Sequence, residues 1–146
     1  MLSIDPNILL YAYSSVSPLH TKAQQFLQSL ANNHSVGISE FALAEFYLLL
    51  RNPAVLTKSL TAAAATEVIQ NYRHHPAWQI FGYPGNSLKL HNELWQKASE
   101  QNFARRRLFD ARMALTLRHF GVTEFATCNP GDFEGFGFQR VWNPLS

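Results

Sequence analysis

The chain lacks the features that mark exported, membrane-spanning or disulfide-stabilised proteins. Its single cysteine, Cys128, excludes a disulfide within the chain and is typical of the reducing cytosol. No apolar run approaches the roughly 20 residues that cross a bilayer. Asp5 and Pro6 interrupt the first apolar stretch, so no basic-then-apolar leader opens the sequence. These absences predict a cytoplasmic protein without a membrane segment.

A strong excess of either charge is also missing. The net charge is only +2, which by itself does not indicate a nucleic-acid binder. The positive charge is nevertheless clustered, because Arg105, Arg106 and Arg107 are consecutive and Arg112 follows them. Apolar residues make up 47% of the 146 residues, which favours a folded chain and, at this length, a single domain over 1–146.

Short apolar stretches alternate with amphipathic segments along the whole chain. The predicted strands lie near 1–4, 35–38, 78–81, 125–127 and 139–142. The predicted helices cover 8–13, 18–30, 40–50, 61–72, 88–101 and 109–120. This alternation predicts an α/β fold in which helices cover both faces of a parallel sheet. Ligands of such folds bind at the carboxyl ends of the strands, where Asp5 and Asp132 are expected.

Glu45 lies on the apolar side of its predicted helix. It points about 130° away from the polar stripe that contains Glu40 and Arg51. A carboxylate among apolar neighbours must be paired, protonated or bound to a metal. A buried ion pair with one of the arginines is the structural alternative, and a functional role is the interpretation that we favour.

Asp110 repeats this arrangement in the helix predicted over 109–120. The alternative is an acid that complements the helix dipole, yet the three preceding arginines oppose that dipole by about 0.3–1 kcal/mol each. Asp5 is equally an N-cap with Pro6 at the first helical position, and Asp132 is equally a turn acid after a Pro-Gly pair. Taken alone, each aspartate thus has a structural explanation.

Taken together, the four acids point to a metal site. Neighbouring carboxylates raise one another's pKa, and a divalent cation removes that repulsion. Ligands that are all oxygen favour Mg²⁺ or Mn²⁺ over zinc. Such a site beside an arginine cluster is suited to phosphodiester hydrolysis, with the arginines on the phosphates of the substrate. The predicted metal ligands are Asp5, Glu45, Asp110 and Asp132, and the predicted phosphate contacts are Arg105, Arg106, Arg107 and Arg112.

Several segments carry a resemblance to a known family. They are Ile4 to Leu9, Ser39 to Glu45, Phe109 to Arg112, Phe125 to Phe133, and the closing Val141 to Pro144. In this order, over nearly the full length, the sequence resembles the PIN-domain ribonucleases, specifically the VapC-type toxins of bacterial toxin–antitoxin pairs. The resemblance implies a three-layer α/β/α fold around a mainly parallel sheet of four or five short strands.

The resemblance also implies which acids bind metal. Asp5, Glu45 and Asp110 match the three core acids of the family. Many relatives place a further aspartate where this chain has Asn129, while others use the acid that matches Asp132. We favour Asp132 as the fourth acid and Asn129 as a neutral helper.

Two further residues and several partners follow from the resemblance. Asn7 and Thr127 match positions that hydrogen-bond the ligands or the attacking water. The family dimerises and is silenced by a cognate VapB-like antitoxin, whose tail enters the active-site groove. The first hypothesis is therefore a Mg²⁺-dependent endoribonuclease toxin. The second is a non-catalytic PIN-fold module that binds RNA or a protein, and the unsettled fourth acid keeps it open.

Overall fold

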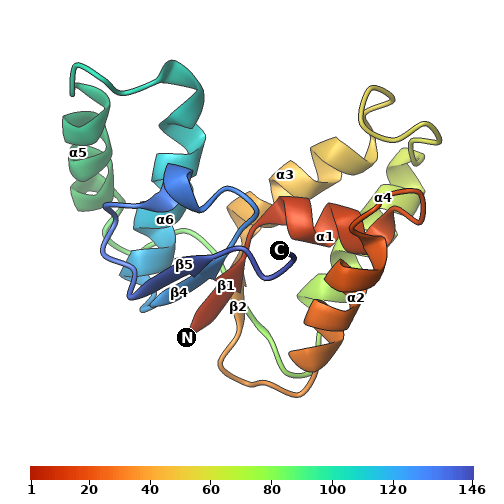
Figure 1. The fold of residues 1–146 in the computed structure, drawn as a ribbon. Helices are drawn as coiled ribbons and strands as arrows, with labels where there is room; N and C mark the ends of the chain where they lie inside the picture. The colour runs from red at the N-terminus through yellow and green to blue at the C-terminus, as the bar shows by residue number, and fades with distance from the viewer.

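The computed structural model describes residues 1–146 and has five short strands at its centre (Figure 1). The strands are β1 (Leu2–Ile4), β2 (Gly37–Ser39), β3 (Gln79–Phe81), β4 (Glu124–Ala126) and β5 (Arg140–Trp142). One sheet has the order β1-β4-β5 and a second pairs β2 with β3, and every pairing is parallel. A parallel bridge between Leu2 and Val36 joins the two sheets. The predicted mainly parallel sheet of four or five strands is confirmed.

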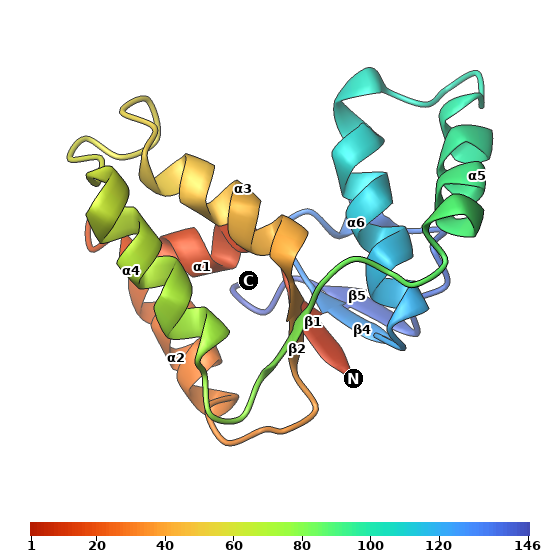
Figure 2. The same ribbon diagram turned by 180° about the vertical axis from the view of Figure 1, so that it is seen from behind.

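Six helices flank these strands. They are α1 (Pro6–Tyr13), α2 (His20–Ser29), α3 (Glu40–Leu50), α4 (Ala62–Arg73), α5 (Ser87–Ala98) and α6 (Leu108–His119). Helices α1 to α4 gather on one side of the strands, and α5 and α6 gather on the other (Figures 1 and 2). The layered α/β/α arrangement predicted from the sequence is therefore present. No helix is both long and apolar enough to span a bilayer.

Two short 3₁₀ helices, η1 (Arg105–Arg107) and η2 (Pro130–Phe133), lie where the sequence predicted no regular structure. Pro130 begins η2, and its fixed φ favours such a turn. The arginine triplet of η1 leads directly into α6, whose first residue has no side-chain cap before it. The predicted loops are therefore more regular than their composition indicated.

Strands β1, β2 and β4 are largely buried because helices cover both faces of the layer of strands. Ile4, Ile38 and Phe125 are fully buried and belong to one main core of 26 residues. A separate small cluster, which includes Leu94 and Leu115, packs α5 against α6. Burial of this apolar surface is the main stabilising contribution to such a fold. It fixes the strand ends from which the polar side chains project.

Two helices are capped by the residue at the end of the strand that precedes them. The Asp5 carboxylate accepts a hydrogen bond from the Asn7 N–H at 3.1 Å, and the Ser39 hydroxyl accepts one from the Ala42 N–H at 3.0 Å. The Asp5 cap was predicted, and Gly121, with a φ of +85°, follows α6. Helices α1 and α3 thus begin directly at the carboxyl ends of β1 and β2.

Candidate active site

Asp5 lies at the end of β1 and is only 5% exposed. The Thr127 hydroxyl donates a hydrogen bond to Asp5 Oδ2 at 2.7 Å, and the Asn7 N–H occupies Oδ1. Thr127 follows β4, the strand that pairs with β1, so the two side chains meet although 122 residues separate them. Burial raises the pKa of Asp5, while these two hydrogen bonds oppose the shift. The carboxylate is therefore oriented by the protein itself.

Glu45 and Asp110 face the same region from α3 and α6. Burial raises the pKa of Glu45 to about 7, and the negative charges of Asp110 and Asp5 add to the shift. Burial raises the pKa of Asp110 to about 6, with further contributions from Asp5 and Asp132. Both side chains are half-buried. Carboxyl groups far apart in the chain thus interact electrostatically.

Asp132 lies in η2, which follows β4. Its charge contributes to the raised pKa of both Asp5 and Asp110. Asn129 is exposed, and its backbone N–H donates to the Thr127 hydroxyl at 3.1 Å. Asp132 therefore has electrostatic contact with the other acids, and Asn129 supports the hydroxyl that orients Asp5.

Three of the four acids form no ion pair. The structure has two ion pairs, Arg73 with Glu40 at 2.8 Å and Arg107 with Asp132 at 4.0 Å. Glu45 forms no ion pair, so the buried Arg–Glu45 pair that was its structural alternative is not present. Asp5 and Asp110 have none either. Arg112 opposes the pKa shift of Glu45, and Arg107 opposes that of Asp110, but burial outweighs both cations and the two pKa values stay raised.

A hard divalent cation fits this donor set by its chemistry. The four side chains offer only oxygen, and three of them have no ion-pair partner. No group of three or more His, Cys, Asp or Glu side chains is, however, arranged so that it could hold a metal ion directly. The carboxyl groups are nevertheless close enough to raise one another's pKa values.

The predicted RNA-contacting arginines divide into two pairs. Arg105 and Arg106 are exposed on η1. Arg107 donates to the backbone carbonyl of Asp132, and its buried Nε has no hydrogen-bond partner. Arg112 also has a buried, unpartnered Nε. One pair is free to contact a ligand, and the other lines the acidic region.

Aromatic rings around Arg112 were missed in the sequence. Its guanidinium carbon lies 4.3 Å from the ring centre of Phe41 and 5.0 Å from that of Phe109. The spacing of these aromatic residues relative to the acids could have indicated them. Phe41 stands one helical turn before Glu45, and Phe109 directly precedes Asp110.

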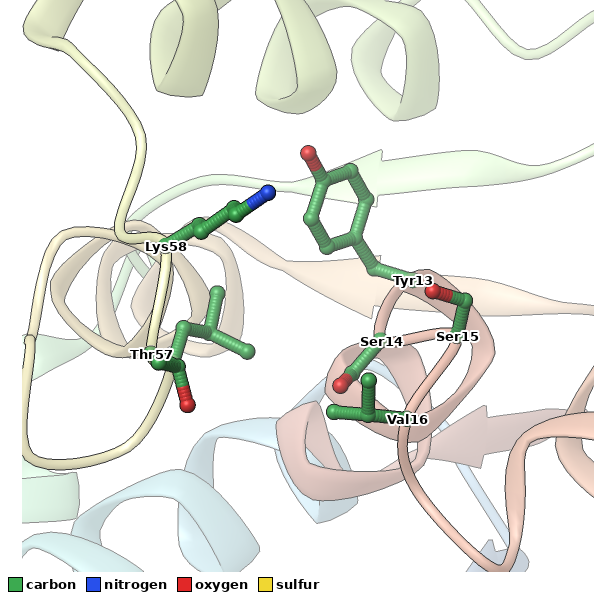
Figure 3. Close-up of a pocket in the computed structure, with 7 residues that line it drawn as sticks. Tyr13, Ser14, Ser15, Val16, Thr57 and Lys58 are labelled. Atoms are coloured by element: carbon green, nitrogen blue, oxygen red, sulfur yellow. The ribbon is translucent and has the colours of Figure 1, made fainter.

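A groove leads away from the acidic region along α1. A pocket of about 360 Å³ includes Asn7, and a second of about 470 Å³ lies beyond it (Figure 3). The two pockets share Ser14, Val16 and Leu56. In the second pocket Tyr13 and Lys58 point toward each other, from the end of α1 and from the loop after α3. We call the two together the Asn7–Lys58 groove.

Comparison with known proteins gives full-length relatives. No family model matches the chain. The chain is 48% identical to Ribonuclease VapC24 from two strains of Mycobacterium tuberculosis, over 100% of this chain and 98% of the relative.

Solved structures share the fold at low sequence identity. M. tuberculosis VapC20, a sarcin–ricin loop cleaving toxin, superposes with a TM-score of 0.69 at 17% identity, covering 94% of this chain and 96% of that one. The structure of FitAB bound to an IR36 DNA fragment superposes with a TM-score of 0.67 at 19% identity, covering 100% of this chain and 96% of that one. Rickettsia felis VapBC2, bound to a DNA fragment from its promoter, superposes with a TM-score of 0.62 at 18% identity, covering 97% of each chain. With its arrangement of acids and its full-length relative, the chain belongs to the VapC-type PIN-domain ribonuclease toxins.

Proposed function

We propose that this ribonuclease is a Mg²⁺- or Mn²⁺-dependent endoribonuclease whose metal ligands are Asp5, Glu45, Asp110 and Asp132. The observation that carries the proposal is the group of interacting, partly buried carboxyl groups, of which three have no ion-pair partner. When bound, a divalent ion activates water and stabilises the charge that develops on the phosphate. One main core supports residues 1–146 as a single catalytic domain.

The chain's own residues orient this chemistry. The Thr127 hydroxyl and the Asn7 N–H fix both oxygens of Asp5, and the hydroxyl accepts in turn from the Asn129 N–H. We propose that Asn7 and Thr127 act as positioning residues. Arg107 holds η2 through the Asp132 carbonyl, which keeps the fourth acid beside the others.

Mn²⁺ titration combined with an RNA cleavage assay tests the proposed function. We expect calorimetry to detect Mn²⁺ binding, and cleavage of RNA to stop in EDTA and return with Mg²⁺. We expect the cut ends to carry 5′-phosphate and 3′-hydroxyl groups, and sequencing of these ends would identify the RNA target. RNA binding without Mn²⁺ binding or cleavage would instead support the non-catalytic module.

Positive side chains beside α6 supply the phosphate contacts. Arg105 and Arg106 are exposed on η1 and directly precede the helix that carries Asp110. We propose that they bind RNA phosphates, while Arg107 and Arg112 act closer to the acids. Replacing both exposed arginines by glutamine is expected to lower the salt dependence of RNA binding by about two in the log–log slope. An unchanged slope would contradict this assignment.

The antitoxin is proposed to enter along the Asn7–Lys58 groove. The groove has exposed apolar side chains, with Val16 83% and Tyr13 43% exposed, and it begins at Asn7, whose N–H donates to Asp5. We expect Val16→Asp to weaken binding of the co-expressed antitoxin at least about tenfold and to leave RNA cleavage intact, because an apolar contact is lost outside the acidic region. Equal antitoxin binding by the variant would place the antitoxin elsewhere.

A homodimer is proposed through the outer surface of α3 and α4. Leu48 is 67% exposed beside an apolar pocket of about 430 Å³ that Leu43, Tyr47 and Ile69 line. Sedimentation is expected to give a dimer for the wild type and a monomer for Leu48→Asp. Leu88→Asp is the matched control, since Leu88 is 76% exposed on α5, and it should stay dimeric. A monomeric wild type would contradict the proposal.

The proposed site of action is the cytosol. Cys128 is a free thiol, as expected of a reducing compartment where RNA substrates are present. Cell fractionation would check this, and recovery of the protein outside the cytosolic fraction would contradict it.

A further inference from the structure

A row of aromatic rings and one guanidinium group lies beside the acids. The Tyr83 ring packs edge-on against Phe41 with their centres 5.2 Å apart. Arg112 lies between Phe41 and Phe109, at 4.3 Å and 5.0 Å from their ring centres. The order Tyr83, Phe41, Arg112, Phe109 is continuous, and we call it the aromatic stack.

Both ends of the aromatic stack are open. Tyr83 is 77% exposed and Phe109 is 60% exposed, although both are large rings. The two exposed rings are linked through Phe41 and Arg112, and a connected exposed apolar surface is a mark of a binding site. The cation at the centre of this stack distinguishes it from a purely apolar surface.

The aromatic stack is joined to the acidic site by two helices. Phe41 stands on α3 one turn before Glu45, and Phe109 directly precedes Asp110 on α6. The exposed Arg105 lies just before this point on η1. A polyanion held at the acids would therefore pass over rings that lie beside free positive charges.

We propose that the aromatic stack is a platform on which unpaired RNA bases flanking the cleaved phosphate are stacked. This inference rests on the proposed endoribonuclease function and names the form of its substrate. Single-stranded nucleic acid is bound by this combination of aromatic faces and nearby cations, and stacking tolerates every base. Charge complementarity favours RNA over a second copy of this chain, whose corresponding surface carries the same positive charges.

The aromatic stack also predicts which RNA geometry is bound. The bases of a duplex are already paired and stacked, so they cannot lie on an outside ring. Loops and unpaired strands are therefore the expected substrates. The order of bases matters less than their accessibility.

Fluorescence of a short single-stranded RNA containing 2-aminopurine tests the platform, with Ca²⁺ replacing Mg²⁺ to suppress cleavage. Wild-type protein is expected to quench the probe on binding. The double variant Tyr83→Ala, Phe109→Ala is expected to lose the quenching and to raise Kd at least about tenfold. Tyr83→Phe keeps a ring and should retain both. Trp95→Ala removes an exposed ring from α5, away from the acids, and should change neither.

Each other outcome overturns a defined part of the inference. Unchanged Kd and quenching in the double alanine variant would refute the platform, and so would equal binding of a duplex. If the double variant becomes monomeric while its RNA affinity stays the same, the rings form an interface between copies instead. A wild type that fails to cleave RNA with Mg²⁺ refutes the proposed function. Normal wild-type cleavage combined with normal cleavage by the double variant refutes the platform alone.

Discussion

Replacing Asp5 by asparagine is expected to reduce metal-dependent RNA cleavage more than about 100-fold. Loss of a residue that only orients a metal ligand already reduces metal affinity or activity by about 10–100-fold, and loss of a ligand exceeds this. The fold should survive, because asparagine is as good an N-cap as aspartate. A labelled RNA cleavage assay with Mg²⁺ measures the first effect, and circular dichroism measures the second.

The same variant should melt no lower than the wild type. Burial raises the pKa of Asp5, so its charged form is unfavourable in the metal-free protein, and a neutral amide removes that penalty. Thr127→Val is the related test, because it removes only the hydroxyl that donates to Asp5, and we expect about a 10–100-fold loss of metal affinity. Glu67→Gln is the matched control, an exposed acid on α4 that should have no effect. Full activity of Asp5→Asn would refute the metal assignment.

The second large effect is expected in stability against pH. Without metal, these acids should make the melting temperature fall as the pH rises from about 4 to about 7. The pKa of Glu45 is raised from 4.5 to about 7, and the pKa of Asp110 is raised from 3.8 to about 6. The folded state therefore binds more protons than the unfolded state across this window. Its stabilisation is complete below the unfolded pKa values and is lost as the pH rises through the folded ones.

The size of this effect is moderate. Solvent screening of half-buried groups leaves roughly 2 kcal/mol, which corresponds to about 4–8 °C in melting temperature for a chain of this size. Mg²⁺ or Mn²⁺ should restore the loss at high pH, because the cation binds the charged carboxylates. Melting curves in EDTA and in Mg²⁺ across the pH range make this measurement.

Glu45→Gln separates the acids from other titrating groups. Burial lowers the pKa of His75. The contribution of His75 to stability therefore increases as the pH rises, whereas that of the acids decreases. The contribution of His75 cancels in the difference between the melting temperatures of the wild type and the variant, which leaves the contribution of Glu45. The variant should be more stable than the wild type at high pH without metal, and inactive. A difference that does not change with pH would show that Glu45 keeps an ordinary pKa.

Much of the fold was accessible from the sequence because local patterns determine local structure. Each predicted strand and helix matches an element of the structure within a few residues. Asp5, followed by Pro6, identified a helix start through the hydrogen bond that such a side chain accepts. Glu45 and Asp110 stood out as acids on apolar helix faces, where charge needs a partner.

The tertiary structure decided how those residues meet. The Thr127 hydroxyl finds Asp5 across 122 residues only because β1 and β4 pair in parallel register. The contact of Arg112 with Phe41 depends on how α3 and α6 pack, and neither helix encodes that distance alone. Periodicity along a chain specifies which face of an element is buried, but contacts between elements depend on sheet order and helix packing, which are set by burial of the whole core.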